Sequence, residues 1–152
     1  MAQPARSQRK DKPLVKILGG QSKLNHPLQS DFDIVNLSYE GVSKASVEAL
    51  LSYLGISKKL FAEQILNISV KTLERKSLTD KMDKRTSSHV IEIAKVMVHA
   101  LAVFEDEEKV KSWLSNSNRA LNNKKPIEFF DTLTGLSMVN DILGRIEEGV
   151  YS

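Results

Sequence analysis

The chain has 152 residues, a formal net charge of +3 and 41% hydrophobic residues, a composition that can bury the core of one domain. It contains no cysteine, which excludes disulfides, thiolate metal sites and a cysteine nucleophile. None of the three histidines stands at metal-ligand spacing from another, so we expect neither a metal ion nor a cofactor. The sequence has neither a membrane-spanning apolar run nor a signal-peptide pattern, which predicts a cytoplasmic protein.

The first 41 residues are predicted to form an N-terminal extension. Residues 1–13 are basic and hold two prolines with few large apolar side chains, which is typical of a disordered arm. Residues 14–18 form a short apolar patch whose secondary structure the pattern leaves open. Ser30 or Asp31 can begin a short helix that Gly41 ends.

Residues 42–104 are predicted to form a helical DNA-binding region. Ser43 and Ser57 stand at the N-cap positions of two helices that carry apolar residues at helical spacing. A third, short helix begins at Ser69. It follows a turn at Asn67, a residue that tolerates the left-handed conformation of a tight turn.

The two short helices of residues 58–76 resemble a helix-turn-helix. Leu66, Ile68 and Leu73 lie before, within and after the turn, where that motif needs apolar packing. Residues 57–85 hold eight basic and four acidic residues, so they carry +4 and leave −1 for the rest of the chain. Such a concentrated basic segment favours DNA, although a plain helical hairpin with a solvated face would show the same charges. The residues expected to contact DNA are Ser69, Lys71, Thr72, Arg75 and Lys76.

The rest of the chain is predicted to be helical as well. An apolar stripe at spacings of three and four residues predicts a long helix over residues 86–104, and acidic residues beyond it favour another helix. Pro126 can open a short helix, and Gly135 is expected to break the chain before a last helix over residues 136–147. No stretch alternates as a strand does, so we expect an all-α fold in which residues 105–152 form a small C-terminal domain.

The C-terminal segment carries a set of residues in a distinctive order and spacing. They are Trp113–Leu114, Asn118–Arg119–Ala120–Leu121, Pro126, Thr132 to Gly135, Leu143–Gly144–Arg145–Ile146 and Gly149–Val150. This pattern resembles the C-terminal domain of the MbcA/ParS/Xre antitoxin family, and residues 68–76 resemble the family's Xre-type helix-turn-helix. The resemblance covers residues 42–152. It departs from the family pattern at His89 and Glu92, where the family usually carries arginines.

The resemblance implies an antitoxin of a type II toxin–antitoxin system and not an enzyme. It implies a partner that is a RES-domain toxin, an enzyme that degrades NAD, and a second partner that is operator DNA. The C-terminal residues would block the toxin's active site, and the helix-turn-helix would repress the antitoxin's own operon. Because such repressors read paired half-sites, we expect at least a dimer. The residues expected to neutralise the toxin are Arg145, Glu147, Glu148, Gly149, Val150, Tyr151 and Ser152.

The chemistry of this tail suits a cofactor cleft. The terminal carboxylate, Glu147 and Glu148 can pair with basic residues that hold the phosphates of NAD, and Tyr151 can stack or donate a hydrogen bond. A plainer interpretation stays open for single residues, since Arg145 can pair with Asp141 one turn earlier. An alternative for the whole chain is a stand-alone helix-turn-helix regulator whose C-terminal helices only dimerise.

Overall fold

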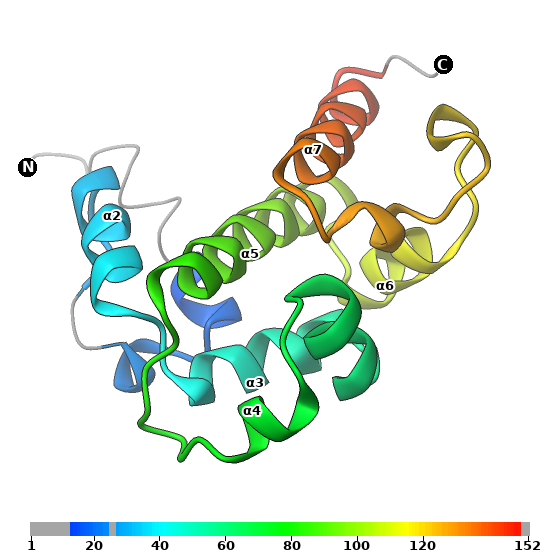
Figure 1. Cartoon of the computed structure of the whole chain (residues 1–152). Coiled ribbons are helices and arrows are strands. Elements are labelled where there is room, and N and C mark those ends of the chain that lie inside the picture. The colour runs from blue at the N-terminus through cyan, green and yellow to red at the C-terminus, as the bar shows by residue number, and fades with distance from the viewer. Residues whose placement is uncertain (1–12, 25–26, 150–152) are drawn as a thin grey trace, which may run out of the picture. The chain divides into compact units, whose positions relative to one another are not determined.

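The computed structural model describes residues 13–24 and 27–149. These residues are mostly helical (Figure 1), and the β contacts within them are two isolated bridges, Ser43 with Lys81 and Asn118 with Lys124. The predicted all-α fold is therefore confirmed.

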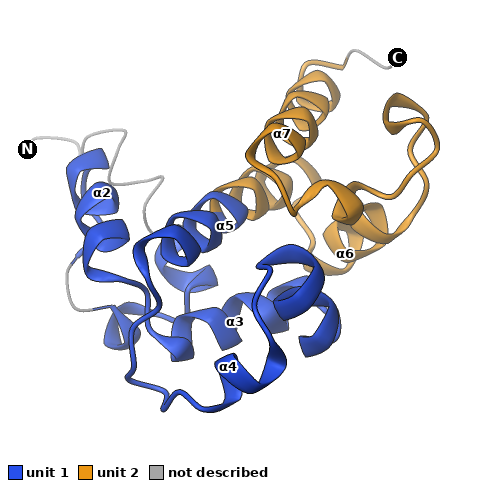
Figure 2. Cartoon of the chain, viewed as in Figure 1, with its two compact units in different colours: residues 1–94 blue, residues 95–152 orange. Residues whose placement is uncertain are grey.

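The chain divides into two compact units, residues 1–94 and residues 95–152 (Figure 2). Unit 1 contains η1 (Gln21–Lys23), α2 (Asp31–Glu40), α3 (Lys44–Leu54), η2 (Leu60–Ile65) and α4 (Val70–Glu74). The division falls inside α5 (Lys84–Phe104), which contributes to both units. Unit 2 also contains α6 (Glu107–Ser115), η3 (Arg119–Leu121), η4 (Pro126–Phe129) and α7 (Leu133–Glu147). The domain boundaries expected at residues 42 and 105 stay predictions.

Helices α2, α3 and α4 begin at predicted capping residues, and α2 and α3 end at predicted glycines. The hydroxyls of Ser30, Ser43 and Ser69 each accept a hydrogen bond from the backbone N–H three residues on, and so begin α2, α3 and α4. Gly41 and Gly55 follow α2 and α3 with φ of 94° and 67°, a region where glycine ends a helix at little steric cost. Local chemistry therefore places these helices.

The apolar patch near the N-terminus belongs to the core of unit 1. Residues 13–17 are helical, and Leu14, Ile17 and Leu18 are buried. The predicted N-terminal extension therefore contributes to the hydrophobic stability of the unit. Other fully buried side chains of unit 1 are Val42, Leu50, Phe61, Leu73, Ile91 and Ile93.

The helix predicted after Ser57 contains a π-helical segment. Ser57 caps its first turn, and the segment η2 follows. Within it Leu66 N–H donates to Phe61 O, five residues back, at 2.9 Å. Asn67 then adopts φ of 57°, which confirms the predicted left-handed turn before α4.

The start of α5 differs from the prediction. The helix begins at Lys84, two residues before the expected position 86. Asp83 causes the difference, because its Oδ1 accepts a hydrogen bond from Thr86 N–H at 2.7 Å and so caps the helix earlier.

The prediction that Gly135 breaks the chain is wrong. α7 begins at Leu133, and Gly135 lies in its first turn, where its N–H donates to Thr132 Oγ1. A Cβ at this position would meet the carbonyl oxygen of Phe129. The glycine is therefore needed because two backbone segments approach closely at this point, and it does not break the chain.

Among the described residues, α5 is the one helix long and apolar enough to cross a membrane by length and composition. Core helices of soluble proteins meet the same criteria. Its residues Val90, Ile93 and Met97 are buried within the fold, whereas Glu92 and Lys95 interrupt its apolar sequence. This pattern is that of a core helix.

Candidate functional site

The exposed face of α4 carries most of the residues predicted to contact DNA. The helix packs against η2, and Leu73 is buried. Lys71, Thr72 and Arg75 are exposed, as their spacing from Leu73 requires. Thr72 Oγ1 lies 2.7 Å from the hydroxyl of Ser69, so both side chains take part in the cap. Lys71 and Arg75, four residues apart, therefore present positive charge on one face of the motif.

Lys76 does not lie on that exposed face. It is half-buried, and its Nζ donates to Lys81 O at 3.2 Å. The side chain thus ties α4 to the loop that follows it. A direct contact of Lys76 with DNA stays a prediction.

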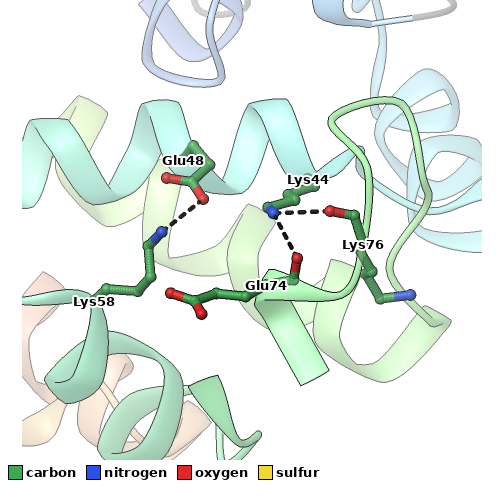
Figure 3. Close-up of polar contacts among 5 residues, drawn as sticks. All are labelled: Lys44, Glu48, Lys58, Glu74 and Lys76. Atoms are coloured by element: carbon green, nitrogen blue, oxygen red, sulfur yellow. Dashed lines mark hydrogen bonds and ion pairs between the residues drawn. The ribbon is translucent and has the colours of Figure 1, made fainter. Parts of the chain in front are cut away.

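Lys44, the first residue of α3, holds the C-terminal end of α4. Its Nζ donates to Lys76 O at 2.8 Å and to Glu74 O at 3.4 Å (Figure 3). Its backbone N–H donates to Asp80 O at 2.9 Å, in the loop beyond α4. One residue of α3 therefore satisfies carbonyl groups at the end of α4 and in the following loop.

A second contact from α3 reaches the helix before the turn. Glu48 Oε1 lies 3.3 Å from Lys58 Nζ, an ion pair that Figure 3 also shows. The two side chains are 31% and 35% exposed, so water screens the pair and it contributes about 0–1 kcal/mol. Both helices around the turn are thus connected to α3, one through Lys44 and the other through Glu48.

Two aspartates accept backbone hydrogen bonds between α4 and α5. Asp80 accepts a hydrogen bond from Ser77 N–H at 2.8 Å, which, with the charge of Lys76, lowers the pKa of Asp80. The hydrogen bond from Thr86 N–H lowers the pKa of Asp83 in the same way. Both carboxylates are therefore ionised at neutral pH, and they act as caps of local structure.

In unit 2 a polar cluster connects the last turn of α7 to α5. His99 Nε2 lies 2.8 Å from Glu147 Oε2, and His99 Nδ1 lies 2.7 Å from Asn140 Oδ1. The side chain of His99 is 24% exposed and that of Glu147 is 59% exposed. Glu147, which the sequence places among the toxin-neutralising residues, is therefore already engaged within the chain.

The other described residues of the predicted neutralising segment are exposed. These are Arg145, Glu148 and Gly149. Gly149 N–H donates to Ile146 O at 3.0 Å and closes the end of α7. The remaining predicted residues, Val150, Tyr151 and Ser152, lie outside the described residues.

A comparison with known families finds a match for the C-terminal part of the chain. Residues 99–149 match the domain described as the antitoxin Xre/MbcA/ParS C-terminal toxin-binding domain. This part of the chain is therefore similar to the toxin-binding domain of Xre/MbcA/ParS antitoxins, the family that the sequence pattern resembles. The matched residues of this antitoxin domain begin at His99 and include all of α7.

Relatives of the chain carry antitoxin names as well. The Prs ADP-ribosylating antitoxin of Sphingobium sp. (strain YBL2) is 23% identical over 133 residues, 81% of this chain and 83% of its own length. The antitoxin Xre of Photorhabdus laumondii is 30% identical over 91 residues, 59% of this chain and 62% of the relative. The antitoxin Xre of Yersinia enterocolitica is 30% identical over 87 residues, 56% of this chain and 59% of the relative. The matches thus span about three fifths of the two Xre relatives.

Several residues that carry the Xre/MbcA/ParS resemblance have structural roles. Asn118 Oδ1 accepts a hydrogen bond from Ala120 N–H at 2.9 Å and begins η3. Pro126 is the first residue of η4, and Thr132 begins α7 by accepting from Gly135 N–H at 2.9 Å. At these positions the residues of the pattern determine where η3, η4 and α7 begin.

Lys44 and His99 were not identified from the sequence. Lys44 gave one signal, because a cation in the first turn of a helix is disfavoured by the helix dipole and suggests a partner elsewhere. His99 gave none, since a single histidine on a helix face is compatible with many surroundings.

Proposed function

We propose that this chain is a cytoplasmic, non-catalytic antitoxin of a type II toxin–antitoxin system that blocks a RES-domain, NAD-degrading toxin with its C-terminal segment. The observation that carries the proposal is the match of residues 99–149 to a toxin-binding domain. The name of the Sphingobium relative points to related chemistry, because ADP-ribosylation is a reaction that consumes NAD.

The exposed end of α7 supports a role in inhibition. Arg145 and Glu148 are accessible to a partner. The carboxylate of Glu148 can form charge-assisted hydrogen bonds with the basic residues that hold NAD phosphates in a toxin. A tail of few residues also loses little conformational entropy when it enters a cleft. The proposed segment includes Val150, Tyr151 and Ser152.

We further propose that α4 binds operator DNA and that the antitoxin represses its own operon as a dimer. The exposed cations Lys71 and Arg75 support this role, and paired half-sites require two copies of the motif. The apolar stripe of α5 is largely buried within the chain. Large exposed apolar side chains lie instead on α2 and α7: Phe32, Val35, Tyr39, Leu133 and Met138.

A truncation tests the inhibitory role of the tail. We expect a chain that lacks residues 148–152 to fold, because α7 ends at Glu147, and to bind DNA. Co-expressed with the enzyme encoded by the adjacent gene, it should no longer prevent NAD loss and growth arrest. The matched control is Arg75→Ala, which should protect cells normally but lower operator affinity by about 1–3 kcal/mol.

Two outcomes would contradict the proposal. If the truncated chain protects cells at matched expression, inhibition comes from the helical surface of unit 2 and not from the tail. If no toxin accompanies the chain and it still represses transcription, the chain is a stand-alone regulator.

A further inference from the structure

α4 has too few residues to hold its own position. It spans five residues, so most of its backbone groups lack a partner within the helix. Helices this short are unstable in isolation. Leu73 is its one buried residue, and a helix anchored at a single point can pivot about it. The direction of Lys71 and Arg75 therefore depends on contacts at the two ends of α4.

The N-terminal end of α4 is held locally, whereas the C-terminal end is held by α3. Ser69 accepts a hydrogen bond from Thr72 N–H at 3.0 Å at the first turn. At the last turn, Lys44 Nζ donates to the carbonyl groups of Glu74 and Lys76. Lys44 is thus the residue of α3 that fixes the second end of α4 (Figure 3).

The position of Lys44 is explained by α4 and not by α3. As the first residue of α3, it places a cation where the helix dipole is positive, which is unfavourable for α3. Its ammonium group instead meets the last carbonyls of α4, where the dipole favours positive charge. The ion pair of Glu48 with Lys58 connects the helix before the turn to the same face of α3.

We infer that Lys44 is a positioning residue for DNA recognition: it sets the direction of α4 without contacting DNA itself. This inference rests on the DNA-binding part of the proposed function. Base recognition requires paired hydrogen bonds of defined geometry, whereas phosphate contacts tolerate a moving helix. Loss of the Lys44 contact should therefore reduce sequence discrimination and leave non-specific binding intact.

The test compares Lys44→Met with two other variants. Methionine keeps the length of the side chain and removes its charge and donors, whereas Lys44→Arg keeps both. Lys71→Met is the matched control at an exposed position. Affinity is measured by fluorescence anisotropy between about 50 and 200 mM salt. The probes are a duplex from the region upstream of this chain's own gene and a scrambled duplex of equal length.

We expect Lys44→Met to lower affinity for the upstream duplex about tenfold, the equivalent of one or two hydrogen bonds. Its affinity for the scrambled duplex and its salt dependence should match the wild type, and Lys44→Arg should restore discrimination. Lys71→Met should weaken binding to both duplexes and reduce the slope of log affinity against log salt by about one.

Hydrogen exchange provides a second measurement that needs no DNA. Arg75 N–H donates to Lys71 O at 2.9 Å, and Lys76 N–H donates to Leu73 O at 3.3 Å. In Lys44→Met these two amides should exchange faster while amides in the buried part of α5 keep their wild-type rates. A variant that had merely lost global stability would show faster exchange everywhere.

Four results would overturn the inference. Lys44→Met could weaken binding to both duplexes and reduce the slope of log affinity against log salt, which would make Lys44 a phosphate contact. The variant could still discriminate between the two duplexes as the wild type does, or the two amides could exchange at their wild-type rates. Either result would rule out the positioning role. Equal binding of the wild-type chain to both duplexes refutes the DNA-binding part of the proposed function itself, and the inference with it.

Discussion

The contact between His99 and Glu147 leads to a quantitative prediction about the end of α7. The sequence predicts that Glu147 contacts the toxin, whereas the structure places its carboxylate 2.8 Å from His99 Nε2. If Glu147 acts through His99, substitutions at the two positions will not be additive. We therefore predict coupling between His99→Leu and Glu147→Gln in a double-mutant cycle, and none between His99→Leu and Glu148→Gln.

The expected magnitude follows from the exposure of the two side chains. Glu147 is 59% exposed and His99 is 24% exposed, so water screens the pair and its coupling should be about 0.5–1 kcal/mol. His99→Leu also removes the hydrogen bond with Asn140, which contributes about 1 kcal/mol. We expect the free energy of unfolding to fall by about 1.5–2 kcal/mol for His99→Leu and by about 0.5–1 kcal/mol for Glu147→Gln.

Urea unfolding of the wild type, the single variants and the double variant measures the coupling. NAD levels in cells that co-express the toxin measure function. Both single variants should weaken protection to a similar extent, and the double variant should weaken it no further. Additive unfolding energies would refute the contact in solution. Loss of protection by Glu147→Gln alone, with His99→Leu fully active, would show that Glu147 contacts the toxin directly.

Asp83→Ala should lower the free energy of unfolding in urea titrations by about 1 kcal/mol, since it removes the N-cap of α5, and Asp83→Asn should lower it by less, because asparagine keeps the capping oxygen and loses only the charge. The hydrogen bond from Thr86 N–H lowers the pKa of the Asp83 carboxyl in the folded chain. The stability that the ionised carboxylate adds is therefore present above the ordinary carboxyl pKa of 3.8 and is lost as pH falls through the lowered folded value. The difference in free energy of unfolding between wild type and Asp83→Asn should then vanish in acid. Gly135→Ala should destabilise the chain by about 1–3 kcal/mol, because its Cβ meets the carbonyl of Phe129; an unchanged melting temperature would contradict that packing. Light scattering at micromolar concentration should detect at least a dimer, and a monomer would count against recognition of paired half-sites.

Short-range chemistry accounts for the parts of the fold that could be predicted. Ser30, Ser43 and Ser69 each accept a hydrogen bond from a backbone N–H three residues away. The pattern of a capping hydroxyl before an apolar repeat was therefore sufficient to predict where these helices begin. The turn at Asn67 is equally local, because it depends on the tolerance of one residue for a positive φ. The exposed positions of Lys71 and Arg75 followed from helical periodicity.

Long-range contacts account for the parts that could not be predicted. Lys44 reaches carbonyls 30 and 32 residues later, and His99 reaches side chains 41 and 48 residues later. Periodicity gives the face on which a residue lies but not the partner it meets there. Gly135 illustrates the same limit, since only the approach of the Phe129 carbonyl shows why a glycine stands inside α7.

The π-helical turn of η2 affects how this chain tolerates changes in length. In a π-helix the hydrogen-bonded residues lie five positions apart in the sequence, where those of an α-helix lie four apart, so the segment contains one more residue than an α-helical turn would. Deleting one residue within Leu60–Ile65 would allow ordinary α-helical bonding before the turn at Asn67. The same deletion within α3 would rotate every preceding side chain by about 100° relative to those that follow and remove its apolar residues from the core. Among homologues, single-residue differences in the length of unit 1 should therefore be tolerated at η2 more readily than in α3.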